Sequence, residues 1–126
     1  MAADARRADP RRALGATGEE AVASWYVAAG YRVLDRNWRC REGELDLVFA
    51  RPGTVVFCEV KTRRSTAYGS PAEAVTITKQ RRIRTLAMRW LSEHPEARAR
   101  ELRFDVAAVM AARGSAPVID VIEGAF

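Results

Sequence analysis

The residues best suited to chemistry are two carboxylates and a lysine in two neighbouring apolar segments. Asp46 lies within Glu44-Leu45-Asp46-Leu47-Val48-Phe49, whereas Glu59 and Lys61 lie within Val55-Val56-Phe57-Cys58-Glu59-Val60-Lys61. Both segments are typical of central strands. An ionised carboxylate in such a strand costs many kcal/mol unless it is paired, solvated in a cleft or bound to a cation. The two carboxylates therefore mark a candidate site.

Strand alternation predicts which side chains share a face. In the first segment it groups Glu44, Asp46 and Val48 opposite Leu45, Leu47 and Phe49. In the second it groups Phe57, Glu59 and Lys61 opposite Val56, Cys58 and Val60. A hairpin through the turn signal Pro52-Gly53 would bring Asp46 and Glu59 close together. Two like charges at close range repel unless a cation or Lys61 neutralises them.

Hard oxygen ligands with open positions suit Mg²⁺ or Mn²⁺, which also accept phosphate oxygens of a substrate. Lys61 lies about 7 Å along the strand from Glu59. Its ammonium could orient an attacking water or stabilise charge that builds on phosphorus. Glu19 shares the inward face of a predicted helix and is the natural third carboxylate. The alternative is a structural salt bridge from Lys61 to Glu59 or Asp46.

Positive charge is concentrated in residues 61–89. This stretch contains one acid, Glu73, and eight basic residues: Lys61, Arg63, Arg64, Lys79, Arg81, Arg82, Arg84 and Arg89. Such a surface could neutralise several phosphates and release counterions, which gives salt-dependent affinity for nucleic acid. The alternative is an ordinary solvated helix face. Because the run begins at Lys61, beside the carboxylates, a nucleic-acid surface is favoured.

The order of elements predicts an α/β fold with a mixed sheet covered by helices. A helix opens at Thr17, with Glu20 completing a capping box, and stops at Gly30. A second helix runs from Pro71 or Ala72 to about Glu93, after a loop over 64–71 around Tyr68. The predicted strands are Tyr31–Trp38, Glu44–Ala50, Thr54–Lys61, Leu102–Met110 and Pro117–Glu123.

The length of 126 residues suits one domain, expected over residues 14–126 after a mobile basic tail over residues 1–13. No apolar run is long enough to span a membrane. The net charge of +5 suits a polyanionic partner. Cys40 and Cys58 are expected to be reduced thiols of a cytoplasmic protein. The single histidine, His94, precedes Pro95 and suits a helix end better than a catalytic triad.

Several motifs in order resemble a known family. Asp46, Glu59 and Lys61 resemble the PD-(D/E)xK nuclease signature, and the chain after the tail is similar to the YraN-type family of uncharacterised bacterial predicted endonucleases. The matching segments are Gly15-Ala16-Thr17-Gly18-Glu19, Asn37-Trp38-Arg39, Gly43-Glu44-Leu45-Asp46-Leu47, Phe57-Cys58-Glu59-Val60-Lys61-Thr62-Arg63, Tyr68-Gly69-Ser70-Pro71, Lys79, Arg103-Phe104-Asp105 and Ala125-Phe126. Cys58 departs from the valine more common in that family.

The resemblance implies a restriction-endonuclease-like fold, similar to archaeal Holliday-junction resolvases. It implies that Glu19, Asp46 and Glu59 are acidic site residues and that Lys61 is the catalytic lysine. It further implies that the Val60 carbonyl is a metal ligand. By the same likeness, Lys79 would contact phosphate near the site.

The sequence thus predicts a nucleic-acid-binding protein that hydrolyses phosphodiesters with Mg²⁺ or Mn²⁺, with DNA expected ahead of RNA and branched DNA as one candidate substrate. The basic residues expected to bind nucleic acid are Arg63, Arg64, Lys79, Arg81, Arg82 and Arg84. Resolvase-like relatives imply a homodimer, although no separate apolar stripe demands one. A non-catalytic binding module with the same fold, and an adaptor whose basic helix binds an acidic protein, remain as alternatives.

Overall fold

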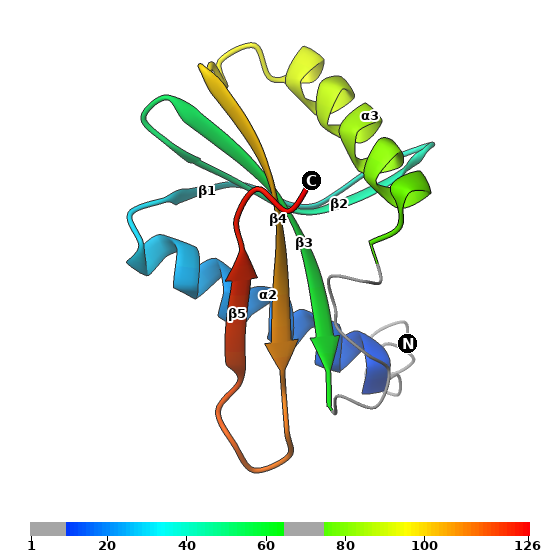
Figure 1. Cartoon of the computed structure of the whole chain (residues 1–126), viewed down its shortest axis with the longest axis vertical. Coiled ribbons are helices and arrows are strands. Elements are labelled where there is room, and N and C mark those ends of the chain that lie inside the picture. The colour runs from blue at the N-terminus through cyan, green and yellow to red at the C-terminus, as the bar shows by residue number, and fades with distance from the viewer. Residues whose placement is uncertain (1–9, 65–74) are drawn as a thin grey trace, which may run out of the picture.

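The computed structural model describes residues 10–64 and 75–126, which form two helices and five strands (Figure 1). The elements are α2 (Pro10–Ala28), β1 (Arg32–Cys40), β2 (Gly43–Arg51), β3 (Thr54–Arg63), α3 (Ile77–Glu93), β4 (Glu101–Met110) and β5 (Val118–Ile122). The strands follow the sequence order across one sheet. This α/β architecture is the predicted fold class, and it is consistent with a restriction-endonuclease-like fold.

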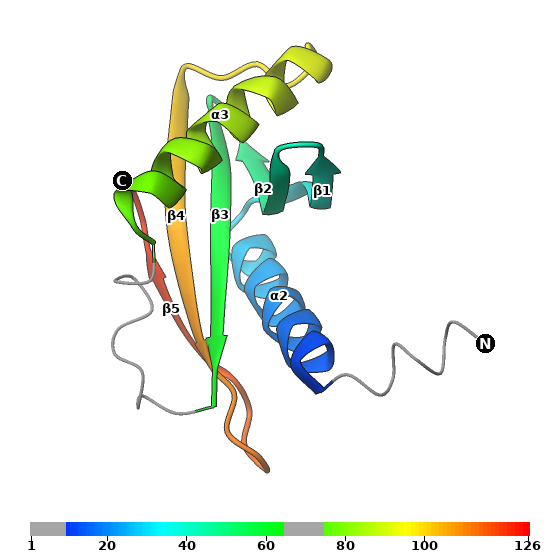
Figure 2. The ribbon, with the colours of Figure 1, turned by 90° about the vertical axis from the view of Figure 1, so that its right-hand side faces the viewer.

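The sheet is mixed because one of its four pairings is parallel. β1, β2 and β3 form an antiparallel meander, β4 runs parallel to β3, and β5 returns antiparallel to β4. A parallel neighbour needs a crossover connection, and α3 lies within it. In Figures 1 and 2, α3 lies beside the half of the sheet where β3 begins, whereas α2 lies beside the half where β3 ends.

The two helices bury two different apolar clusters. Ile83, Leu86 and Trp90 of α3 pack in one of them, together with Phe57 of β3. The cluster of α2 is built from Val22, Ala23, Tyr26, Leu47, Phe49, Val56, Cys58, Ala107 and Val109. Both faces of β3 are therefore covered, which explains its nearly continuous apolar sequence.

The sheet splits where β2 leaves β3. Their pairing stops at Leu47 and Cys58, whereas β3 continues along β4 as far as Arg63. Figure 1 shows the β1–β2 hairpin and the end of β3 pointing in different directions. Glu59 and Lys61 lie in the part of β3 beyond the split, so the predicted chemical residues sit where the regular hydrogen bonding of β2 with β3 ends.

The simple alternation predicted for β2 is wrong at this split. Leu45 packs in the cluster of α3, whereas Leu47 packs in the cluster of α2, so the two leucines do not share a face. On β1, Arg36 pairs with Leu47 and Trp38 pairs with Leu45, which leaves Asn37 opposite Asp46. Asn37 has a φ of 50°, a left-handed conformation that asparagine tolerates better than most residues. β1 is therefore irregular at the position opposite Asp46.

Both helix starts differ from the sequence prediction. α2 begins at Pro10, so Thr17 lies inside the helix and the predicted capping box is wrong. Residues 10–13, predicted as tail, belong to this helix, and the rest of the tail lies outside the described residues. α3 begins at Ile77, where the Thr76 hydroxyl accepts a hydrogen bond from the Lys79 N–H at 3.2 Å. The predicted loop around Tyr68 also lies outside the described residues.

Other local predictions are confirmed. The five strands match the predicted segments to within a few residues. Both cysteines are free, and His94 is the C-cap of α3. Neither helix in the described part of the chain is long and apolar enough to cross a membrane.

Candidate functional site

The carboxylate of Asp46 binds the backbone of β3 at the split. Its Oδ2 accepts a hydrogen bond from the Val60 N–H at 2.9 Å. This contact replaces a hydrogen bond that a continuing β2 would have made. Because the N–H and C=O of one strand residue point to the same edge, the Val60 carbonyl also faces the space left by β2. The Val60 carbonyl therefore lies on the edge of β3 that Asp46 contacts.

Glu59 is the buried carboxylate of the site and contacts two lysines. Oε1 of Glu59 lies 3.4 Å from Nζ of Lys61 and 3.4 Å from Nζ of Lys79. Only 10% of the Glu59 side chain is exposed, against 36% for Lys79. Lys61 comes from the same strand, whereas Lys79 comes from the first turn of α3. Burial, and then the neighbouring ammonium of Lys79, lower the pKa of Lys61.

Asp46 and Glu59 interact electrostatically, as the hairpin predicted. Burial raises the pKa of Asp46 to about 7, and the negative charge of Glu59 contributes next. The hydrogen bond from Val60 acts in the opposite direction, and Glu19 and Glu44 raise the pKa further. A cation at this position would be attracted by all of these carboxylates and would allow Asp46 to ionise. Burial and the neighbouring carboxylates together therefore favour the protonated form of Asp46 when no cation is bound.

Glu19 reaches the site from α2. Burial raises its pKa, a hydrogen bond with the Asn37 side chain lowers it, and Glu44 and Glu59 raise it. Gly18, the preceding residue, lets the helix lie close to β3: a Cβ there would overlap the Thr62 hydroxyl and lie only 3.0 Å from the Thr62 Cβ. This close approach holds Glu19 near the carboxylate pair.

The donor set fits a hard divalent cation. Asp46, Glu59 and the Val60 carbonyl offer oxygen atoms only, which is the chemistry that Mg²⁺ and Mn²⁺ prefer. No group of three histidine, cysteine, aspartate or glutamate side chains able to hold an ion occurs in residues 10–64 and 75–126. An ion at this position would therefore need the carbonyl, water and substrate oxygens to complete its coordination, as is usual for Mg²⁺.

The predicted basic residues divide into four groups, three of them on α3. Lys79 lies in the site itself, as the resemblance implied. Arg81 and Arg82 are exposed on α3, and Arg82 approaches the β1–β2 turn near Gly43. The Arg84 guanidinium lies 4.6 Å from the centre of the Phe104 ring and 5.7 Å from that of Phe126, so it packs on aromatic side chains.

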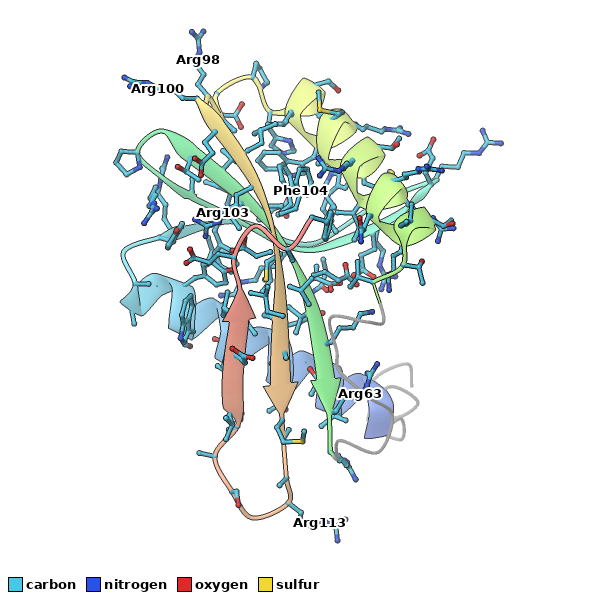
Figure 3. All side chains as sticks on the ribbon, in the orientation of Figure 1. Arg63, Arg98, Arg100, Arg103, Phe104 and Arg113 are labelled. Atoms are coloured by element: carbon cyan, nitrogen blue, oxygen red, sulfur yellow. The ribbon has the colours of Figure 1, made fainter. Side chains whose placement is uncertain are left out.

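The other two arginines lie at the end of β3. Arg63 is half-buried and donates a hydrogen bond to the Thr62 carbonyl. Arg64 is exposed. Arg63 lies near the start of α2 (Figure 3), where it lines one hollow together with Gly15 and Glu19. Positive charge is therefore present both on α3 and at this end of β3.

Sequence reasoning missed Asn37 as a site residue. Its side chain binds Glu19, and its left-handed backbone lies opposite Asp46. The available signal was an asparagine inside a predicted strand, because asparagine is depleted in strands and enriched where φ is positive.

These observations define a class of protein: an α/β domain whose split sheet holds a half-buried aspartate, a buried glutamate and a lysine. The chain belongs to the uncharacterised protein family UPF0102, whose model matches residues 18–109. It is 52% identical to the UPF0102 protein of Rhodococcus opacus over 114 residues, which cover 90% of this chain and 96% of that protein.

Two further proteins of the same family are similar to this chain over most of its length. The UPF0102 protein of Nocardia farcinica is 48% identical over 120 residues, covering 95% of this chain and 94% of the relative. The UPF0102 protein of Frankia casuarinae is 54% identical over 114 residues, which cover 90% of this chain and 96% of that protein. The family match includes Glu19, Asp46, Glu59 and Lys61.

Proposed function

We propose that this protein is a metal-dependent endonuclease that hydrolyses phosphodiester bonds in DNA. The observation that carries the proposal is the arrangement at the split of the sheet, where Asp46 accepts a hydrogen bond from Val60 N–H at 2.9 Å and Glu59 Oε1 lies 3.4 Å from Lys61 Nζ. Two neighbouring carboxylates, one half-buried and one buried, repel each other and are a candidate cation site. Mg²⁺ or Mn²⁺ held there would withdraw charge from a phosphate oxygen and acidify a water molecule.

The residues of the chain then have separate tasks. Asp46, Glu59 and the Val60 carbonyl would hold the cation. Glu19 orders the water on the α2 side, and Lys61 donates hydrogen bonds to the attacking water or to the phosphate. Water attacks the phosphorus and releases one proton to solvent, the bond to the leaving sugar oxygen breaks, and that oxygen takes up a proton from solvent.

A non-catalytic nucleic-acid-binding module is the second candidate. The specific observation in its favour is that Lys61 and Lys79 both contact Glu59, which partly neutralises the pair without a metal. Calorimetric titration with Mn²⁺ distinguishes the two candidates. The endonuclease requires binding that Asp46→Asn abolishes, whereas the binding module requires none.

A cleavage screen tests the endonuclease directly. Branched, single-stranded and duplex DNA, with RNA of the same sequences, are incubated with the protein and Mg²⁺ or Mn²⁺. Cleavage should appear with at least one substrate, and Asp46→Asn should abolish it, because the substitution removes a cation-binding charge and keeps the shape. Asp120→Asn, at an exposed position of β5, is the matched control and should cleave normally. Cleavage by Asp46→Asn at the wild-type rate would exclude the assigned site.

A further inference from the structure

A hollow lies between α2 and the β1–β2 hairpin, next to the candidate site. Its volume is about 510 Å³, and its lining residues are Gly15, Ala16, Glu19, Asn37, Arg39 and Glu44. A second hollow of about 290 Å³ continues past Gly15 and Glu19 toward Val60, Thr62 and Arg63. Cavities that hold a small organic ligand have volumes of a few hundred Å³, so each hollow has room for a group the size of a nucleotide.

Small residues of α2 keep this space open. Gly15 lines both hollows, and a Cβ built on it meets no atom within 4 Å. Gly18, one turn later, has the opposite surroundings, because a Cβ there would overlap Thr62. One glycine therefore allows the helix to approach β3, whereas the other leaves an unfilled space at the surface.

The lining of the larger hollow suits a nucleobase better than a phosphate. Glu19 and Glu44 present carboxylate oxygens, which repel phosphate and accept hydrogen bonds from amino groups of bases. Arg39 is the single cation, its side chain is 77% exposed, and it lies 3.6 Å from Glu44. A guanidinium in this position can stack on an unpaired base.

The hollow is also close enough to the carboxylate pair to matter for cleavage. Glu19 lines it directly and interacts electrostatically with Glu59. Glu44 lines it too and raises the pKa of Asp46. A base placed in the hollow would therefore belong to a nucleotide next to the phosphodiester at the site.

We propose that the hollow of Gly15, Asn37, Arg39 and Glu44 holds one unpaired base beside the scissile phosphodiester. This inference rests on the proposed function and names its substrate class: nucleic acid with unpaired nucleotides, as in single strands, flaps or forks. Cytosine, which has an exocyclic amino group, suits the carboxylates. Thymine presents a carbonyl oxygen at the equivalent position and does not.

Binding of two single strands of equal length, one all cytidine and one all thymidine, tests the base pocket. Fluorescence anisotropy in EDTA reads binding without cleavage. Oligocytidine should bind about tenfold more tightly than oligothymidine, the size of one good base contact. Glu44→Gln, whose amide can donate as well as accept, should reduce this ratio. Equal affinities of the wild type for the two strands would overturn the inference.

Gly15→Leu is the second test, because a Cβ at this position meets no atom within 4 Å and the side chain would occupy the hollow that Gly15 lines. It should weaken oligocytidine binding about tenfold, and thermal unfolding checks that it folds. Ala28→Leu, at an exposed position of the same helix, is the control and should bind like the wild type. Unchanged binding by Gly15→Leu would overturn the inference. A cytosine preference without any cleavage would overturn only the endonuclease, whereas cleavage without any base preference would overturn only the base pocket.

Discussion

Lys79, in the first turn of α3, places its Nζ atom 3.4 Å from Oε1 of Glu59 in β3. Lys61 lies at the same distance from the same oxygen. A residue eighteen positions after Lys61 in the sequence thus contributes to the site as directly as Lys61 does. The position of α3 on the sheet and the charge balance around Glu59 are therefore linked.

Replacing Lys79 should change metal binding and nucleic-acid binding in opposite directions. Lys79→Met removes a cation that neutralises Glu59, so the affinity for Mn²⁺ should rise several-fold in a calorimetric titration. DNA binding should weaken, because a phosphate contact is lost. Arg81→Met, at an exposed position of the same helix, should leave Mn²⁺ affinity unchanged. A lower Mn²⁺ affinity in Lys79→Met would contradict the assignment.

The raised pKa of Asp46 predicts a pH-dependent stability in the metal-free protein. Its usual value is 3.8, and in the folded protein it is about 7. Between these values the folded protein keeps a proton that the unfolded chain releases, so stability falls as pH rises from about 4 to about 7 and then levels. The Asp46→Asn variant has no ionisable group at this position, so its free energy of unfolding should not show this decline.

Urea unfolding at about pH 5 and about pH 8 measures the effect. The free energy of unfolding of the wild type, relative to that of Asp46→Asn, should decrease between the two pH values. Asp120→Asn, whose wild-type carboxylate is exposed, should follow the wild type. An equal change in the free energy of unfolding of wild type and Asp46→Asn between the two pH values would show that Asp46 titrates normally.

The two glycines of α2 predict opposite effects of the same substitution. Gly18→Ala should destabilise the protein by about 1–3 kcal/mol, because its Cβ would overlap the Thr62 hydroxyl and lie 3.0 Å from the Thr62 Cβ. Gly15→Ala meets no atom and should stabilise the helix by up to about 1 kcal/mol. Adding Thr62→Ala should recover part of the loss in Gly18→Ala. Equal stabilities of both single variants would rule out the close approach.

The contribution of the positive charge on α3 to DNA binding is best tested at Arg81 and Arg82, both of which are exposed. Replacing both with Ala should weaken binding to all DNA sequences alike and flatten the salt dependence by about one unit of slope per lost phosphate contact. Arg84 packs on Phe104 and Phe126, so Arg84→Ala should lower stability as well. An unchanged slope in the double variant would place the DNA surface elsewhere.

Cutting both strands of a branched junction is simplest with two sites related by a two-fold axis. Each chain supplies one candidate site, so a paired-cut mechanism predicts a dimer. Light scattering with and without branched DNA measures the assembly. A monomer of 14.0 kDa in both conditions would contradict paired cutting and leave a nicking or end-trimming enzyme.

The strands and the closeness of Asp46 to Glu59 could be predicted because the information is local. The Pro52-Gly53 turn and the apolar segments on either side specify the hairpin. The divergence of β2 from β3 could not be predicted, since it depends on two helices packing against different parts of the sheet. The placement of Leu45 and Leu47 in different clusters follows from that divergence.

Other features depended on contacts distant in the sequence. The aromatic partners of Arg84 come from β4 and the last residue of the sequence, so the basic run in α3 alone could not distinguish it from Arg81. The capping motif of Thr17 and Glu20 predicts a start of α2 that is too late, because such a motif can also occur inside a helix.

The hydrogen bond from Val60 to Asp46 makes one backbone amide a spectroscopic reporter of the site. A charge-assisted hydrogen bond is shorter and stronger than a neutral one. The ¹H–¹⁵N resonance of Val60 should therefore shift as Asp46 titrates near pH 7, and again when a cation engages the carboxylate. Occupancy of the site by a cation can then be followed at a single nuclear magnetic resonance peak in the absence of substrate.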